Sequence, residues 1–208
     1  SPMDITTFMI AVFCLIDDYL AFQRLRKRGP QPTLRDREVL TIEVVGEFLR
    51  LDTESNLFAH FCRYYADWFP GLRKITRTTF TRQAANLWKI KQIIWQALAR
   101  QIPHDPYLSI VDSFPVPVCR FARAPRCRSF GPAAAYGHDE VARQTFYGFR
   151  AHVRLAWPGV LIDCTLAPAN IHDTEGAEEL LRGVFGYAWA DRNYWKPELF
   201  ERLRDKGL

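Results

Sequence analysis

The sequence changes character at Pro103-His104-Asp105-Pro106, and this change constrains the fold more than any other feature. Before it, apolar residues recur at the spacing of an amphipathic helix. After it, short β-rich runs alternate with helical patterns. We therefore place a domain boundary near residue 104. The predicted fold class is α+β, with a helical region over residues 1–104 followed by a mixed-sheet α/β region over residues 105–208.

Four helices are predicted in the first region. They cover residues 8–22, 33–51, 55–65 and 78–101, and Pro-containing segments separate them. Hydroxyl side chains stand where these helices begin, and such side chains accept hydrogen bonds from the free N–H groups of a first turn. The expected N-caps, in chain order, are Thr33, Ser55, and Thr78 or Thr79.

The second region predicts the order strand, long insertion, strand, strand, helix, strand, helix. The strands are expected over residues 107–111, 145–156, 159–166 and 187–190, and the helices over residues 174–185 and 196–206. The turn Trp157-Pro158-Gly159 indicates that the second and third strands form a hairpin. With this order of elements, the first and fourth strands are expected to be neighbours at the centre of the sheet.

Two aspartates follow these two strands directly. Asp112 ends the first strand, in Ile110-Val111-Asp112-Ser113, and Asp191 ends the fourth. Because neighbouring strands lie ~4.8 Å apart, the two carboxylates should be close together. Such a pair is repulsive unless a cation lies between them, and hard Mg²⁺ or Mn²⁺ suits oxygen ligands. The pair therefore predicts a site for two-metal phosphoryl transfer. The alternative is that each aspartate only forms a turn or caps a helix.

Composition and charge leave several classes of function open. The chain of 208 residues has a net charge of +5, which is compatible with a nucleic-acid partner and with many ordinary enzymes. Its most apolar stretch, residues 8–16, is too short to span a bilayer. The five scattered cysteines indicate a reducing cytoplasm with free thiols. A zinc site at Cys119 and Cys127 is the weaker alternative, because two thiols supply only half of the usual ligands.

Basic residues concentrate in the insertion between the first two strands. Seven arginines lie between Val118 and Arg154, against Asp139 and Glu140. Arginine forks bind phosphate oxygens in pairs, although a solvated basic surface has the same composition. His152 is either a core histidine or a phosphate contact. Asp173 is expected to cap the helix that follows it, and the alternative is that His172-Asp173 sits near the metal site, because the third strand leads into it.

Several segments, in the same order along the chain, resemble the DDE transposases of bacterial insertion sequences, and in particular insertion-sequence family 982. In the second region they are Asp112-Ser113-Phe114-Pro115-Val116-Pro117-Val118-Cys119, Arg126-Cys127-Arg128-Ser129-Phe130, Tyr136-Gly137, Phe146-Tyr147-Gly148-Phe149-Arg150-Ala151-His152, Pro168-Ala169-Asn170-Ile171-His172-Asp173 and Ala190-Asp191-Arg192-Asn193-Tyr194. In the first region they are Gly46-Glu47-Phe48-Leu49, Phe69-Pro70 and Arg77-Thr78-Thr79-Phe80-Thr81-Arg82.

The resemblance implies a ribonuclease-H-like catalytic domain with three metal-binding acids. Asp112 matches the first acid and Asp191 the second, so both are expected to be catalytic and to bind Mg²⁺ or Mn²⁺ in a two-metal site. The usual second block reads Asp-Lys-Gly-Tyr, and here Asn193 stands where glycine is usual. The third acid, a glutamate on a later helix, has no counterpart before Leu208. We therefore expect a C-terminally truncated domain that cleaves DNA slowly and leaves an uncovered surface on which homo-oligomers form.

The resemblance also implies a DNA partner, namely double-stranded transposon ends, and a cytoplasmic, nucleoid-associated protein without a membrane anchor. The helical region is expected to be helix-turn-helix-like, with a recognition helix beginning near Arg77. A non-catalytic DNA-binding protein or transposition inhibitor derived from a broken element is the alternative, and an unrelated ribonuclease-H-like nuclease is a third. The expected DNA contacts are Arg77, Thr79, Arg82, Arg120, Arg123, Arg126, Arg128 and Arg150.

Overall fold

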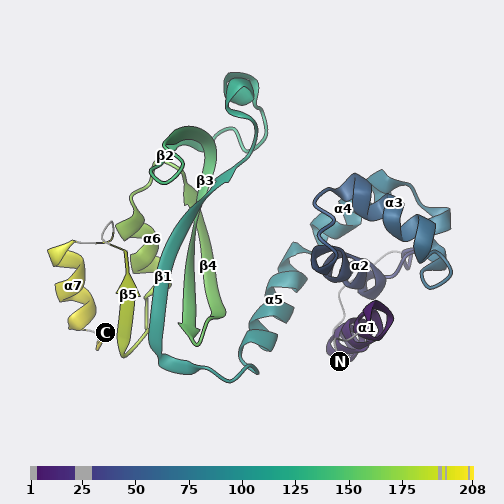
Figure 1. Ribbon diagram of the computed structural model, residues 1–208, viewed down its shortest axis with the longest axis horizontal. Coiled ribbons are helices and arrows are strands. Elements are labelled where there is room, and N and C mark those ends of the chain that lie inside the picture. Colours follow the sequence, from purple (N-terminus) through teal and green to yellow (C-terminus); the bar gives the residue numbers. More distant parts are fainter. Residues whose placement is uncertain (1–3, 22–29, 192–193, 195, 206) are drawn as a thin grey trace. The chain divides into compact units, whose positions relative to one another are not determined.

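The computed structural model describes residues 4–21, 30–191, 194, 196–205 and 207–208 (Figure 1). It divides into two compact units, Ser1–Trp95 and Gln96–Leu208. The division falls within one helix, α5 (Trp88–Ala99), whereas the boundary predicted from the sequence near residue 104 lies just beyond that helix. The first unit is helical, and the second combines a mixed sheet with helices, so the chain has the expected α+β composition.

The first unit contains four helices before α5. They are α1 (Ile5–Ala21), α2 (Asp36–Phe48), α3 (Glu54–Tyr64) and α4 (Arg77–Asn86), with a short 3-10 helix, η1 (Pro70–Lys74), between α3 and α4. The prediction of one long helix to Gln101 is wrong, because α4 ends at Asn86 and Leu87 caps it. Asparagine favours local hydrogen bonds over helix continuation, which accounts for the break.

The predicted helix caps are also displaced. Thr53 rather than Ser55 caps α3, through a hydrogen bond of 3.2 Å from the N–H of Asn56. Thr76, rather than Thr78 or Thr79, caps α4 in the same way. An N-cap residue needs extended backbone so that its oxygen can face the third N–H of the helix. Thr53 and Thr76 both have this conformation.

The start of α2 uses a different device. Thr33 lies outside the helix, and the N-cap is Arg35, whose N–H donates to the Glu38 carboxylate at 2.6 Å. An acidic side chain in the first turn therefore replaces the predicted hydroxyl cap. It also interacts favourably with the positive end of the helix dipole.

Aromatic and aliphatic side chains from α2, α3 and α4 form the core of the first unit. Phe61 of α3 and Phe80 of α4 are almost completely buried, as are Val39 and Ile42 of α2. The helices approach closely at Gly46, where a Cβ atom would lie 2.2 Å from Leu57 Cδ1. The connection between α3 and α4 spans residues 65–76 and is much longer than the turn of about three or four residues in a helix-turn-helix.

The second unit is built on a five-stranded mixed sheet (Figure 1). Its strands are β1 (Asp105–Pro117), β2 (Ala135–Asp139), β3 (Gln144–Trp157), β4 (Val160–Pro168) and β5 (Tyr187–Ala190). The antiparallel β3–β4 hairpin confirms the prediction from the Trp157-Pro158-Gly159 turn. β1 pairs antiparallel with β3 and parallel with β5, which confirms that the predicted first and fourth strands are neighbours. In the described sheet β5 lies at an edge, so the prediction that both strands are central is wrong for β5.

Two features of the sheet differ from the prediction. Strand β2 lies inside the expected insertion and pairs with the first residues of β3. Strand β1 continues to Pro117, so the prediction that it ends at Asp112 is wrong. The extension is stabilised by pairing with the equally long β3, since Ser113 to Pro117 continue the antiparallel ladder. Such pairing is a tertiary contact. The sequence does not predict it, because the prolines at positions 115 and 117 argue against a strand.

Helices α6 (Asp173–Leu180) and α7 (Pro197–Arg204) pack against one face of the sheet. Val111 of β1 joins Ala177 and Leu180 of α6 and Leu199 and Leu203 of α7 in one buried cluster. The opposite face, which we call the open face, carries exposed apolar side chains. They are Ile110, Phe114, Leu166 and Trp189.

We expect Phe61→Ala to lower the free energy of unfolding by about 3–5 kcal/mol, because it leaves a cavity in the helical core. Tyr64→Ala is the matched control, since Tyr64 lies on the same helix with 60% of its surface exposed, and it should cost less than about 1 kcal/mol. Urea denaturation followed by circular dichroism measures both changes. Equal losses for the two variants would show that Phe61 is not a central core residue.

Candidate catalytic site

The parallel pairing of β1 with β5 brings Asp112 and Asp191 together. The paired residues end with Ile110 opposite Trp189 and Val111 opposite Ala190, so Asp112 and Asp191 are the next residues on each strand. Side chains alternate between the faces of a strand. Val111 is buried, whereas Ile110 and Asp112 on either side of it are exposed. The alternation therefore directs Asp112 and Asp191 to the open face, on strands ~4.8 Å apart.

Asp191 is linked by its backbone to a residue of the core. The N–H of Tyr194 donates to the carbonyl oxygen of Asp191 at 3.0 Å, and the Tyr194 ring is 97% buried beside Val111. Burial raises the pKa of Tyr194 to about 12, although nearby Ser113 opposes the rise. Arg192 and Asn193, where the sequence departs from the usual glycine-containing turn, lie outside the described residues.

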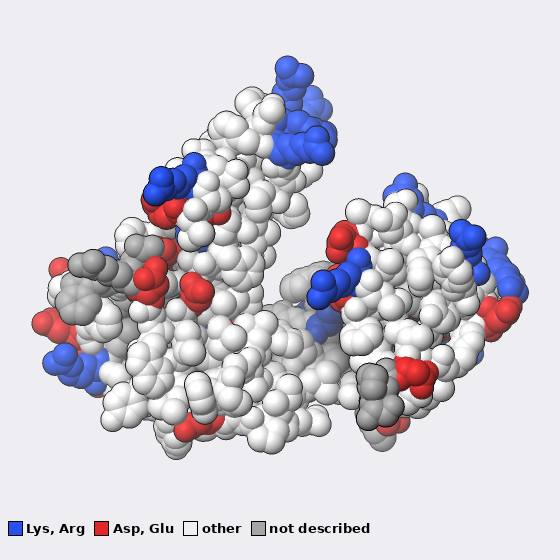
Figure 2. Space-filling model, viewed as in Figure 1, with Lys and Arg blue, Asp and Glu red and all other residues white. Residues whose placement is uncertain are grey.

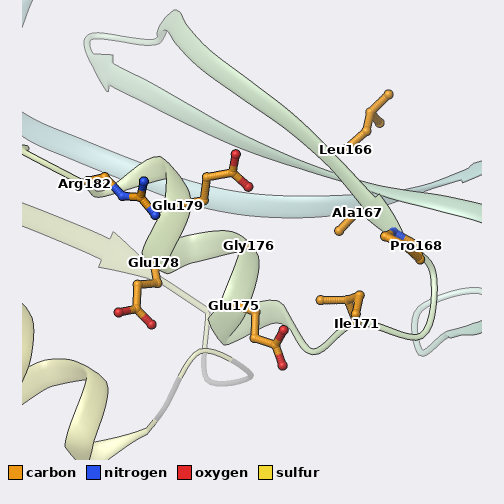
Figure 3. A pocket seen from close by; sticks show the side chains of 9 residues that line it. All are labelled: Leu166, Ala167, Pro168, Ile171, Glu175, Gly176, Glu178, Glu179 and Arg182. Atoms are coloured by element: carbon orange, nitrogen blue, oxygen red, sulfur yellow. The ribbon is translucent and has the colours of Figure 1, made fainter. Parts of the chain in front are cut away.

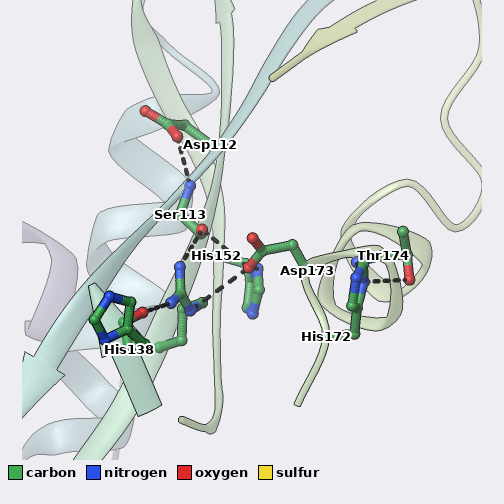
Figure 4. Close-up of polar contacts among 8 residues, drawn as sticks. Asp112, Ser113, His138, His152, His172, Asp173 and Thr174 are labelled. Atoms are coloured by element: carbon green, nitrogen blue, oxygen red, sulfur yellow. Dashed lines mark hydrogen bonds and ion pairs between the residues drawn. The ribbon is translucent and has the colours of Figure 1, made fainter. Parts of the chain in front are cut away.

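A polar network lies on the other face of β1, directly behind Asp112 (Figure 4). The Ser113 hydroxyl donates to the Asp173 carboxylate at 3.1 Å, and Arg150 Nε lies 3.6 Å from the same oxygen. Arg150 also donates to the carbonyl oxygen of His138 at 2.7 Å. The network joins β1, β3 and the first turn of α6, and thereby holds the strand segment that carries Asp112.

The prediction that Asp173 caps its helix is wrong. The N-cap of α6 is His172, whose side chain accepts from the N–H of Thr174 at 3.3 Å. The carboxylate of Asp173 instead points toward Ser113 (Figure 4). It also lies 3.6 Å from Nε of Arg150. An ion pair in this half-buried place outweighs a capping bond, because the Arg150 side chain is only 17% exposed and needs a counter-charge.

His152 is a core histidine rather than a phosphate contact. It is completely buried, and neither ring nitrogen has a hydrogen-bond partner among the described residues. Its Nδ1 lies 4.0 Å from the Asp173 carboxylate, and a Cβ on Gly176 would lie 2.4 Å from its ring. Burial lowers the pKa of His152, and Arg150 adds to this, while Asp173 and Glu179 oppose it. The imidazole is therefore held neutral.

The oxygen ligands at the open face suit a divalent cation. Mg²⁺ is commonly bound by one or two carboxylates and completes its shell with water and substrate phosphate oxygens. Asp112 and Asp191 supply such a pair. In the part of the chain that the structure describes, no group of three or more His, Cys, Asp or Glu side chains is placed to hold a metal ion.

The glutamates of α6 occupy a different place. Glu175, Glu178 and Glu179 line a pocket of about 490 Å³ between α6 and the end of β4 (Figure 3). Glu178 pairs with Arg202 of α7 at 2.9 Å, and Glu179 accepts from the Thr165 hydroxyl at 3.2 Å. These contacts tie α6 to α7 and β4, and so give the glutamates a structural role.

The arginines predicted to contact DNA fall into two environments. A first group of four arginines lies at or beside the 3-10 helix η2 (Phe121–Arg126), beyond the end of β1, where Figure 2 shows basic side chains gathered. All four are exposed, and no ion pair with another described residue involves them. Arg150 differs, because Asp173, Ser113 and the His138 carbonyl already engage its guanidinium. The exposed group is Arg120, Arg123, Arg126 and Arg128.

The predicted recognition helix, α4, presents only part of its polar surface to solvent. Arg77 and Arg82 are exposed, whereas the Thr79 hydroxyl is 3.1 Å from that of Thr76. Gln83 donates to the Leu34 carbonyl and to Asp36, so it belongs to the packing of the unit. The face of α4 that is free to meet DNA therefore includes Arg77 and Arg82.

The sequence did not reveal the network behind Asp112. The sequence contains one signal for this network, namely the alternation in β3 that directs polar Arg150, His152 and Arg154 to the same face. That face was expected to be either core or DNA-binding surface. Only the register shows that Arg150 lies beside Pro115 and that His152 lies opposite Ser113.

We expect acid to destabilise the protein through His152. A buried imidazole whose pKa is lowered from 6.5 stabilises the fold above that pH, because only the unfolded chain takes up the proton below it. The free energy of unfolding should therefore fall as the pH drops below 6.5, by up to about 1.4 kcal/mol per pH unit. Urea denaturation should give a shallower acid slope for His152→Phe. His138→Gln, at an exposed imidazole, is the control, and equal slopes for wild type and His152→Phe would contradict the assignment.

Comparison with known proteins agrees with this geometry. The family model described as "Transposase DDE domain" matches residues 104–208, just over half of the chain. No curated protein matches, and no solved structure matches. Among the described helices, none has the length and apolar character needed to traverse a lipid bilayer. The match begins just before β1, covers both aspartates and the network behind them, and shows that the chain belongs to the DDE transposase domain family.

Proposed function

We propose that this protein is a DNA transposase that binds transposon-end DNA and cuts and joins its strands by metal-dependent phosphoryl transfer. The observation that carries the proposal is the placement of Asp112 and Asp191 as successors of the last paired residues on neighbouring parallel strands. A ribonuclease-H-like assignment is supported by the strand order β4-β3-β1-β5 and by the helix that connects β4 to β5. Assignment to insertion-sequence family 982 rests on the sequence resemblance alone.

The proposed roles of the two aspartates follow from their charge and exposure. Both carboxylates face the open side of the sheet, where a DNA phosphate has access. There they would hold one or both ions of a Mg²⁺ or Mn²⁺ pair, and the bound cations would activate the attacking oxygen and neutralise the leaving one. The chain itself keeps the two carboxylates adjacent despite their repulsion, because β1 and β5 are hydrogen-bonded to each other.

The network behind Asp112 would fix the geometry of the site. Asp173 binds both Ser113, the residue after Asp112, and Arg150 of β3. Tyr194, three residues after Asp191, packs against Val111, the residue before Asp112. Contacts on both sides of Asp112 therefore restrain β1 and Asp191 together. A rigid support of this kind is what in-line transfer requires, since reacting groups must be held within fractions of an ångström.

DNA would be held by two basic surfaces, one in each unit. In the second unit the exposed arginines around η2 have no competing carboxylate among the described residues. In the first unit Arg77 and Arg82 stand on the free face of α4. Guanidinium groups of this kind bind phosphate oxygens in pairs and set the position of the duplex.

We expect Asp112→Asn and Asp191→Asn each to lower the affinity for Mn²⁺ by about tenfold or more, because a carboxylate ligand is lost. Isothermal titration of the purified chain measures this without any cleavage assay. Asp205→Asn is the control, since Asp205 is exposed at the end of α7, and it should bind as the wild type does. Unchanged Mn²⁺ affinity in both site variants would remove the metal site from these residues.

The same variants distinguish catalysis from DNA binding alone. A transposase should nick end-sequence DNA in the presence of Mg²⁺ or Mn²⁺, and either Asn variant should abolish nicking while DNA affinity persists. A non-catalytic DNA-binding protein would not nick at all. A nuclease unrelated to transposition would cut without regard to the end sequence.

We expect replacement of the four η2 arginines by alanine to flatten the salt dependence of DNA binding. Each phosphate contact contributes about 0.9 to the slope of log affinity against log salt, so the slope should fall by about 3 to 4. Fluorescence anisotropy at several salt concentrations measures it. A control variant removes the same charge elsewhere in the unit and should keep most of the slope. It replaces Arg182, Lys196, Arg202 and Arg204. Equal slopes for the two variants would exclude a specific role of the η2 arginines.

A further inference from the structure

The two cysteines at the ends of η2 lie next to each other. Cys119 follows β1 by two residues, Cys127 caps the end of η2, and both are free and half-buried. Both thiols border one cavity, and the Cys127 thiol donates to the Ser129 carbonyl at 3.7 Å. The backbone on the β1 side is anchored, because the N–H of Val118 donates to the Tyr147 carbonyl at 3.0 Å. The proximity of the thiols is therefore a feature of the folded loop.

A cavity of about 260 Å³ reaches this thiol pair. Its walls are Cys119, Ala122, Arg123, Arg126 and Cys127, so both sulfur atoms border a space that a small oxidant can enter. Burial and the neighbouring Cys127 raise the pKa of the Cys119 thiol, and the positive charge of Arg123 opposes this rise. In the described chain no third His, Cys, Asp or Glu side chain joins the two thiols to form a metal site.

We propose that Cys119 and Cys127 form a reversible disulfide on exposure to a hydroperoxide. We further propose that this bond tightens DNA binding by residues 119–128, which we call the arginine loop. The effect on DNA rests on the proposed function, whereas the formation of the bond does not. The bond would close a ring that contains Arg120, Arg123 and Arg126. A disulfide requires Cβ atoms about 3.5–4.5 Å apart, and the two side chains already line the same small cavity.

The chemistry balances with the hydroperoxide as the oxidant. One thiolate attacks the peroxide, its sulfur becomes a sulfenic acid, and hydroxide leaves. The second thiolate then attacks that sulfur, the S–S bond forms, and a second hydroxide leaves. Two sulfurs have lost one electron each, and the peroxide has been reduced to water.

The expected effect on DNA binding is entropic. The reduced loop must give up backbone freedom when its arginines dock on phosphates, and a closed ring has already lost part of that freedom. Oxidation should therefore raise the affinity for DNA by a few-fold, and a thiol reductant should reverse the change.

The experiment treats the full chain with hydrogen peroxide, alkylates the remaining thiols and maps tryptic peptides by mass spectrometry. Arg120, Arg123 and Arg126 separate the two cysteines, so their peptides stay together only through a disulfide. We expect this linked pair in the wild type and in Cys164→Ser, which removes an exposed cysteine elsewhere. Neither Cys119→Ser nor Cys127→Ser should yield it.

DNA affinity is then measured by anisotropy for the oxidised and reduced forms of all four proteins. Tighter binding on oxidation in the wild type and Cys164→Ser, but in neither loop variant, supports the proposal. Absence of the linked peptide overturns it, as does a linked peptide without any change in affinity. If no form binds DNA while the linked peptide is present, the failure lies with the proposed function.

Discussion

The parallel pairing of β1 with β5 is the interaction on which the rest of the second unit depends. Four residue pairs, from Leu108–Tyr187 to Val111–Ala190, join strands that are far apart in the chain. A parallel connection requires a long crossover, and here the β3–β4 hairpin and α6 form it. The pairing buries Val111 under α6 and α7, and it sets Asp112 beside Asp191. Core packing and the candidate metal site are therefore two consequences of one register.

This register places the carboxylates of Asp112 and Asp191 side by side. The opposite face of β1 carries the polar network that holds this part of the strand. Asp173, Arg150 and Ser113 are joined to one another in a half-buried layer, and the uncharged ring of His152 lies beneath them. Removing polar groups from water costs free energy unless they pair, so a layer of this kind is stable only in a restricted geometry. That restriction is useful next to a site where two carboxylates must keep a fixed separation. Among the described residues neither nitrogen of His152 has a hydrogen-bond partner, although Nδ1 lies 4.0 Å from the Asp173 carboxylate.

The arginine loop differs from this half-buried layer in its exposure to solvent. Its side chains are exposed, and it is attached to the sheet through the long extension of β1 beyond Asp112 and the pairing of that extension with β3. The exposed basic tip therefore lies beyond the end of β1, whereas Asp112 lies in the middle of that strand. The proposed covalent link between Cys119 and Cys127 would restrict the backbone of this tip without changing the pairing of β1. The thiol pair and the arginines are thus parts of one small structure.

From the sequence alone, the periodicity of apolar residues determined the α+β class, because a twofold or 3.6-fold repeat records strands and helices directly. The Trp157-Pro158-Gly159 turn indicated the β3–β4 hairpin, and the order of the elements indicated that the first and last strands are neighbours. The helix caps at Thr53 and Thr76 required backbone conformations that several nearby hydroxyl residues could have supplied, so their choice depended on packing. The extension of β1 past Asp112, the strand β2 and the ion pair of Asp173 with Arg150 were decided only by tertiary structure. Each depends on a partner strand or helix distant in the chain, and such partners are set by register and burial rather than by neighbouring residues.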